Sequence, residues 1–172
     1  MTGRETPENP DPVAGYVQQW AAVRPDLDAG PLLVLGRISR LNALVDGVLR
    51  PPFAAEGLAN GDFDLLAALR RAGEPYTLSS TTLAQRMLVS NGAATKRIDR
   101  LEARGFVTRS VSPTDGRGRD IRLTAAGLEL TDRLITQHFD NERAILAALS
   151  TEERERLGEL LGKLLAAVEP TD

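Results

Sequence analysis

The sequence predicts a mainly α-helical fold with one two-stranded β-hairpin, for three reasons. Most of the chain from residue 11 onward divides into stretches whose apolar residues recur at three- and four-residue spacing, the period of an amphipathic helix. Those stretches begin at capping side chains and end at proline or glycine. One stretch, residues 106–124, alternates instead around a cluster of proline, aspartate and glycine, which is typical of a hairpin. With 172 residues, 42% of them apolar and 26% charged, the chain has the composition of one globular domain.

Composition excludes several classes of chemistry. The chain has no cysteine and a single histidine, His138. Thiol nucleophiles, disulfides and Cys/His zinc sites are therefore excluded. The sequence also has no glycine-rich phosphate loop. We expect no enzymatic activity, no cofactor and no metal site.

Hydropathy indicates a cytoplasmic protein without a membrane partner. No apolar run approaches the roughly 18 residues of a membrane span. The N-terminal stretch MTGRETPENPDP has neither the basic nor the apolar region of a signal peptide. Residues 1–10 are polar and proline-rich, and we expect them to be disordered.

Two helices are predicted ahead of the central region. Asp11 is suited to cap a helix with proline at its first position, where a missing N–H costs nothing. This extra N-terminal helix spans residues 11–24 and carries the single tryptophan of the chain, Trp20. A second helix, over residues 31–50, has a continuous apolar stripe and is stopped by two consecutive prolines.

The centre of the chain predicts a helix-turn-helix. Asp62 is the predicted N-cap of a helix that Gly73 closes. A short helix over residues 80–88, a tight turn and a second helix over residues 90–105, capped by Ser90, follow at the spacing of that motif.

The hairpin and two further helices complete the predicted order. The alternation in FVTRSVSPTDGRGRDIRLT predicts two antiparallel strands. Thr124 then caps a long helix that runs to about Leu149. The STEE stretch at residues 150–153 is a capping box that opens the last helix, which has a leucine-rich face.

The charge distribution favours nucleic acid as a partner, although the net charge is −3. Between Lys96 and Arg122 the sequence has eight basic and four acidic residues, so this stretch carries +4 and the remainder −7. A local basic surface on an acidic body is the electrostatic pattern of a DNA-binding protein.

The side chains suited to DNA lie at two places. The first turn of the second helix offers hydroxyl, amide and ammonium groups to the major groove, from Ser90, Asn91, Thr95 and Lys96. The hairpin tip presents Arg117 and Arg119 to the minor groove, with Asp115 placed to orient a guanidinium. The alternative interpretation is an ordinary helical pair followed by a solvated turn.

The stretch LEARGFVTRSVSPTDGRGRDIRLTAAG resembles the winged-helix signature of the MarR family of bacterial transcription regulators. The resemblance rests on the end of the second helix, on the Asp115 and Arg117 tip, and on the entry to the next helix at Thr124. One departure is Gly116, where many members have a second arginine, so that contacts of the wing depend more on Arg117 and Arg119.

The resemblance covers roughly residues 31–168. It implies a winged helix-turn-helix lobe over residues 62–124 with a two-stranded β wing, and a helical dimerisation region over residues 31–50 and 125–168. It also implies a homodimer that binds a pseudo-palindromic operator in double-stranded DNA. The apolar stripes of those helices suit such an interface, because they exceed what one small winged domain can cover.

The helix that carries Trp20 is additional to the minimal family fold. With the stretch DFDLLAALRRAGEPYTLS, it is similar to the urate-responsive branch of the family, the PecS- and HucR-like regulators. That resemblance implies a ligand pocket formed by Trp20, Asp64, Arg97 and Arg109.

Periodicity independently predicts that both arginines face the body of the protein. Arg97 lies four residues before Leu101, on the packed side of its helix. Arg109 alternates with Val107 and Val111 on one face of a strand. Two inward guanidinium groups would suit a planar anion.

The sequence thus predicts a repressor that a small anion, such as urate or a related purine, releases from its operator. The alternative effector is a different anion, a tricarboxylate or a phenolic acid, because paired arginines also bind carboxylates. For single residues the alternatives are a packing role for Trp20, a helix-dipole role for Asp64, and surface or phosphate-contacting positions for the two arginines.

Overall fold

The computed structural model describes residues 11–111 and 118–169. The chain divides into two compact units, Met1–Val48 and Leu49–Asp172, and each is described by itself. Residues 1–10, which we expected to be disordered, lie outside the described residues. The hairpin-tip residues Asp115 and Arg117 lie outside them as well.

The first unit contains α1 (Pro12–Val23) and most of α2 (Leu32–Leu49). As predicted, Asp11 caps α1 and accepts a hydrogen bond from the Val13 N–H at 3.0 Å. Asp11 also accepts from Arg37 Nε of α2 at 2.9 Å, which lowers the pKa of its carboxyl group. Val13 is buried against Gly36, where a Cβ would lie only 3.0 Å from the valine side chain.

The two prolines that end α2 also begin a short helix, α3 (Pro51–Ala55), which the sequence analysis did not predict. Proline is suited to the first turn of a helix because no N–H is needed there. The next helix is α4 (Asp62–Arg71). The prediction that Asp62 caps α4 is wrong: Gly61, with φ of 76°, occupies the cap, and Asp62 is the first helical residue.

The predicted helix-turn-helix is confirmed as α5 (Ser80–Arg86) and α6 (Asn91–Ala103). Ser90 caps α6 by accepting a hydrogen bond from the Ala93 N–H at 3.2 Å. The inner face of α6 is buried in the core of the second unit, through Ala94, Ile98 and Leu101. Because α6 is packed along this face, its opposite face is free to meet a partner.

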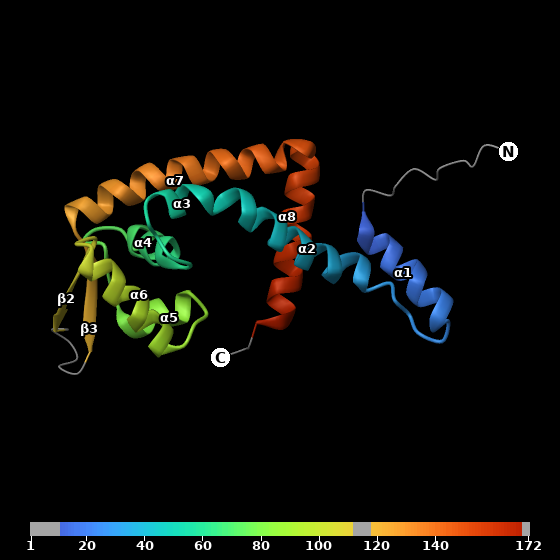
Figure 1. The fold of residues 1–172 in the computed structure, drawn as a ribbon, viewed down its shortest axis with the longest axis horizontal. Helices are drawn as coiled ribbons and strands as arrows, with labels where there is room; N and C mark the ends of the chain where they lie inside the picture. Colours follow the sequence, from blue (N-terminus) through green and yellow to red (C-terminus); the bar gives the residue numbers. More distant parts are fainter. Residues whose placement is uncertain (1–10, 112–117, 170–172) are drawn as a thin grey trace. The chain divides into compact units, whose positions relative to one another are not determined.

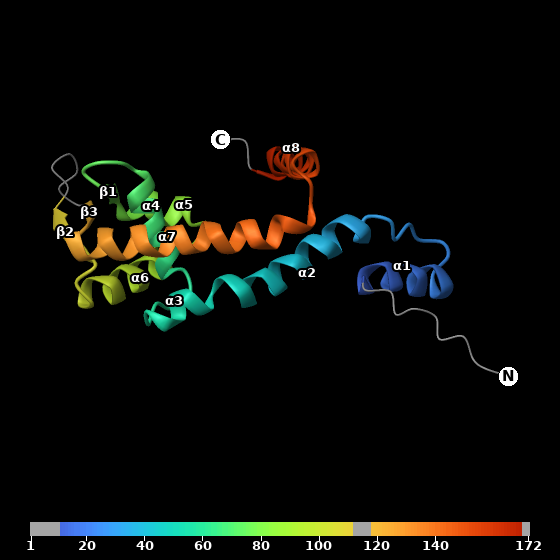
Figure 2. The same ribbon diagram turned by 90° about the horizontal axis from the view of Figure 1, so that it is seen from above.

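The predicted hairpin is confirmed as β2 (Val107–Val111) and β3 (Arg119–Leu123), and it belongs to a three-stranded antiparallel sheet (Figure 2). A short strand, β1 (Thr77–Ser79), pairs with the other side of β3, so that β3 is central. Leu78 and Arg109 lie on either side of Ile121 in the register. The sheet thus joins the start of α5 to the hairpin that follows α6.

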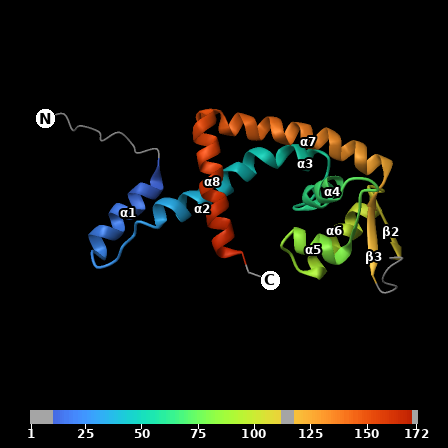
Figure 3. The same ribbon diagram turned by 180° about the vertical axis from the view of Figure 1, so that it is seen from behind.

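The chain ends in α7 (Ala125–Ile145), a 3-10 turn (Leu146–Ala148) and α8 (Thr151–Val168). Thr124 caps α7, and the predicted capping box of Ser150 and Glu153 is present. Figures 1 and 3 show α7 running from the end of β3 past α4 and on to α8. The described helices include none that combines the length and the apolar character needed to cross a membrane.

Candidate nucleic-acid interface and effector site

The cap and the first two turns of α6 present polar side chains outward. Ser90, Asn91, Thr95 and Lys96 are all exposed. The Thr95 hydroxyl donates to the Asn91 carbonyl oxygen at 2.9 Å, while the Ser90 hydroxyl oxygen caps the helix. The amide of Asn91 and the ammonium of Lys96 thus remain the groups at this end of α6 that are best placed to meet a base edge or a phosphate.

Of the wing, the structure describes the two strands, β2 and β3. Arg119 opens β3 opposite Val111 and is exposed. One of its guanidinium N–H groups donates to the Gly118 carbonyl oxygen at 3.2 Å. The predicted contact of Asp115 with Arg117 lies outside the described residues and stays a prediction.

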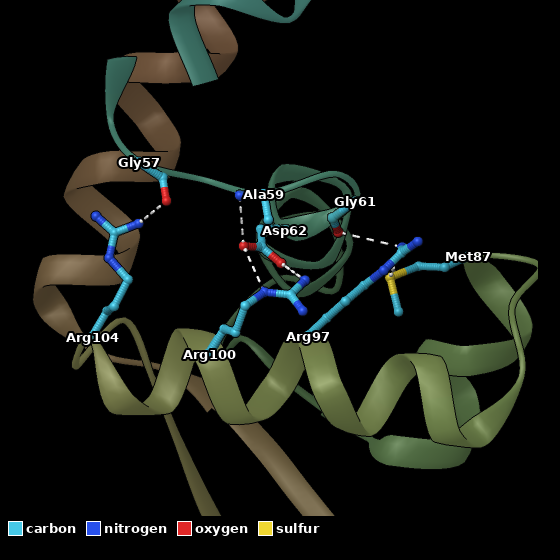
Figure 4. Close-up of polar contacts among 8 residues, drawn as sticks. All are labelled: Gly57, Ala59, Gly61, Asp62, Met87, Arg97, Arg100 and Arg104. Atoms are coloured by element: carbon cyan, nitrogen blue, oxygen red, sulfur yellow. Dashed lines mark hydrogen bonds and ion pairs between the residues drawn. The ribbon is translucent and has the colours of Figure 1, made fainter. Parts of the chain in front are cut away.

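Four of the basic residues counted between Lys96 and Arg122 bind groups at least seven residues away in the chain. Figure 4 shows Arg97, Arg100 and Arg104 on the face of α6 that meets the loop before α4. Arg104 donates to the Gly57 and Glu56 carbonyl oxygens at 2.8 and 2.6 Å. The fourth residue is Arg109. Fewer positive charges can therefore reach DNA than the eight basic residues of the sequence would suggest. Among the described residues, the exposed cations include Lys96, Arg119 and Arg122.

Asp62 and Arg100 form an ion pair that the sequence analysis did not find. Arg100 Nη2 donates to Asp62 Oδ1 at 2.6 Å, and the hydrogen bond raises the pKa of the guanidinium. The Asp62 side chain is 2% exposed. The sequence did contain a signal for this ion pair. Arg97, Arg100 and Arg104 recur at spacings of three and four residues, which places three arginines on one helical face.

Arg97 points inward as its periodicity predicts, and it has weak partners. Its Nη1 lies 3.5 Å from the Gly61 carbonyl oxygen and 3.7 Å from the Met87 sulfur (Figure 4). Within residues 11–111 and 118–169, no carboxylate pairs with this guanidinium. Arg97 is thus a half-buried cation whose polar neighbours are a carbonyl oxygen and a thioether sulfur.

Asp64 lies beside a cavity of about 430 Å³ bounded by α4, α5 and α7. Aromatic and charged side chains line it, with Met87 between the cavity and Arg97. Of the predicted pocket residues, Asp64 lines this cavity, and Arg97 is not among the lining residues but contacts Met87, which is. The lining also includes Phe63, Arg71, Arg86, His138, Phe139 and Glu142.

Arg109 is held elsewhere, by acidic side chains of α6. Its Nε lies 2.9 Å from Glu102 Oε2, and its Nη2 contacts the Asp99 carboxylate. Residues 97 and 99 are about 200° apart around a helix. Arg97 and Arg109 thus lie on different sides of α6, and the structure does not bring them together.

Trp20 belongs to the first unit, where it is 47% exposed. Within that unit it lines a shallow apolar hollow with Leu27 and Leu32. Its predicted role beside Asp64, Arg97 and Arg109 stays a prediction.

The fold and this surface define a class of protein. A second helix packed along one face, with exposed polar side chains at its N-terminal end and a β wing beside it, is the winged helix-turn-helix arrangement of transcriptional regulators. The MarR family profile matches residues 56–118. The chain is also 41% identical over 152 residues to the HTH-type transcriptional regulator PecS of Dickeya dadantii, across 88% of this chain and 92% of that protein. The chain therefore belongs to the MarR family, and within it is PecS-like.

Solved structures agree with this assignment. Sco3205, a MarR family transcriptional regulator from Streptomyces coelicolor in complex with DNA, matches with a TM-score of 0.75 at 27% identity, over 84% of this chain and 91% of that chain. A mutant MarR from E. coli complexed with operator DNA matches with a TM-score of 0.66 at 27% identity, over 85% and 97% of the two chains.

Proposed function

We propose that this protein regulates transcription by inserting the first turn of α6 into the major groove of a DNA operator. The observation that carries the proposal is the exposed polar turn on a helix whose opposite face is buried. The base- and phosphate-contacting residues are Ser90, Asn91, Thr95 and Lys96, with Asp115, Arg117 and Arg119 of the wing in the adjacent minor groove. The DNA complexes of the two structural relatives support this arrangement.

The protein acts as a homodimer on a pseudo-palindromic site. Within Thr151–Val168, no side chain is buried, although the helix has a leucine-rich face. Such a face is stable in water only when another surface covers it, and a second copy supplies an identical one. The exposed apolar residues of α8 are Leu157, Leu160, Leu164, Leu165 and Val168.

A small planar anion, urate or a related purine, releases the protein from DNA. The support is the position of Asp64 at an aromatic-lined cavity, with the poorly satisfied guanidinium of Arg97 behind Met87. An anion that enters there is attracted by Arg97 and repelled by Asp64, and this moves α6. For Arg109 and Trp20 a role in this pocket stays a prediction, because Arg109 binds Asp99 and Glu102 on another side of α6 and Trp20 belongs to the first unit. A coupling of about 1 to 3 kcal/mol lowers operator affinity roughly 5- to 150-fold.

A tricarboxylate or a phenolic acid is the second candidate effector. Arg71 and Arg86 also line the cavity, and arginines bind carboxylates as readily as they bind a purine anion.

The test begins with a duplex that the protein itself selects from a random library. Urate is then titrated against the complex, and tryptophan emission is followed with correction for urate absorption. We expect urate to weaken binding, to change the emission of the single indole, and to do neither in Arg97→Ala. If no sequence is selected, the DNA-binding proposal is wrong. If Arg97→Ala responds like the wild type, the effector site is wrong.

A further inference from the structure

Arg97 and Arg100 of α6, with Arg104 at its C-cap, contact the segment that leads into α4. We call this set, Arg97, Arg100 and Arg104, the arginine clamp. Figure 4 shows all three side chains extending from one face of α6 toward residues 57–62. Arg104 holds backbone oxygens at one end of the segment, and Arg97 contacts the Gly61 carbonyl oxygen at the other. Arg100, between them, binds a side chain instead of the backbone.

That side chain is the carboxylate of Asp62, and it is held on two sides. Its Oδ2 accepts the Ala59 N–H at 2.9 Å. Its Oδ1 accepts Arg100 Nη2 at 2.6 Å, and Arg100 Nε lies 3.4 Å from Oδ2. A two-point contact between a guanidinium and a carboxylate fixes direction as well as distance. Because the loop orients Asp62, the orientation of the loop passes to Arg100 and so to α6.

The ion pair adds a directional contact to the apolar packing of α6. Ala94, Ile98 and Leu101 attach the helix to the core, but burial of apolar surface is non-directional. Hydrogen bonds from the first turn of α6 to base edges tolerate only a few tenths of an ångström of displacement. Reading DNA therefore depends on the rotation of α6 about its own axis, and the pair of Asp62 and Arg100 constrains that rotation.

We propose that Asp62 is a positioning residue for DNA recognition, which acts through Arg100 to set the orientation of α6. Asp62 itself is buried and does not touch DNA. The proposal depends on the binding of DNA by α6 and not on any effector, so it is tested without a ligand.

The measurement is selectivity: affinity for a duplex selected by the wild-type protein divided by affinity for a scrambled duplex of the same length, at one salt concentration. We expect Asp62→Asn to lower this ratio about tenfold, the effect of losing one specific base contact. We expect the affinity for the scrambled duplex to change less than about twofold. This affinity reports on correct folding and on contacts with phosphates. Because the Arg100 side chain is 43% exposed, Arg100→Lys is the second variant: it keeps the charge without the planar fork and should lose selectivity to a similar degree.

The control is Asp132→Asn, which removes an ion pair of the same length, Arg70 Nε to Asp132 Oδ1 at 2.6 Å, between α4 and α7 without touching α6, although Asp132 is more exposed than Asp62. Its selectivity should equal that of the wild type. The double variant of Asp62→Asn with Arg100→Lys should be no less selective than either single variant, since one pair is lost in all three. Wild-type selectivity in folded Arg100→Lys, additive losses in the double variant, or an equal loss in Asp132→Asn would each overturn the proposal.

Discussion

Gly127 lets the first turn of α7 lie against the connection between α6 and β2, and alanine at this position tests that packing. A Cβ there would lie 2.0 Å from the backbone oxygen of Phe106 and 2.9 Å from its carbonyl carbon. An ordinary carbon–oxygen contact is about 3.3 Å, so α7 and Phe106 must separate by more than about 1 Å. Backbone atoms cannot turn aside as a flexible side chain can. We expect Gly127→Ala to lower the free energy of unfolding by about 3 kcal/mol, the upper end of the usual cost of overpacking.

Thermal unfolding followed by circular dichroism measures this effect. For a chain of this length, the expected loss corresponds to a fall in Tm of about 6 to 12 °C. Gly162→Ala in α8 is the matched control, because nothing lies within 4 Å of a Cβ there. Alanine is favoured over glycine inside a helix by about 1 kcal/mol, so the control should unfold at the wild-type temperature or above it. A Tm for Gly127→Ala equal to that of the wild type would show that α7 does not need this close approach.

Three further predictions concern DNA, assembly and pH. Lys96→Ala should weaken binding to selected and scrambled duplexes alike and reduce the slope of log K against log salt by about 1; an unchanged slope would exclude a phosphate contact. Leu164→Glu should give a monomer in light scattering, because a carboxylate in an apolar interface is costly, and a persistent dimer would exclude this face of α8. The Arg133 guanidinium lowers the pKa of the Glu56 carboxyl group from its ordinary value of 4.5. The stabilisation that the ion pair of Glu56 and Arg133 gives to the folded protein is therefore present above pH 4.5, and it is lost as the pH falls through the lowered pKa. The difference in urea midpoint between wild type and Glu56→Gln should thus shrink in acid, and a constant difference would contradict the pairing.

The predictions that succeeded depend on local signals. Ser90 and Thr124 cap helices because a hydroxyl can accept an N–H from three residues ahead, a relation that the sequence contains entirely. The β2–β3 hairpin was also predictable, since alternation on both sides of a turn cluster specifies pairing between neighbours in the chain. The inward direction of Arg97 followed from helical period in the same way.

The features that sequence reasoning missed depend on distant partners. Strand β1 has three residues, too few to show alternation, and it pairs with β3 more than forty residues later. Asp62 has the residue type of a cap, but its carboxylate is occupied by Arg100 of another helix. Arg109 was predicted to face the protein body, yet its neighbours there are the carboxylates of Asp99 and Glu102. In each case the partner was set by tertiary packing and not by the local pattern.

Hydroxyl-radical footprinting of the selected duplex tests the central claim most directly, that two copies of α6 enter successive major grooves. The account predicts a symmetric footprint whose two half-sites are centred about 10 base pairs apart, one helical turn. It also predicts that Asn91→Ala weakens protection at both half-sites equally, because the two copies are identical. A single asymmetric footprint, or protection that Asn91→Ala leaves unchanged, would contradict it.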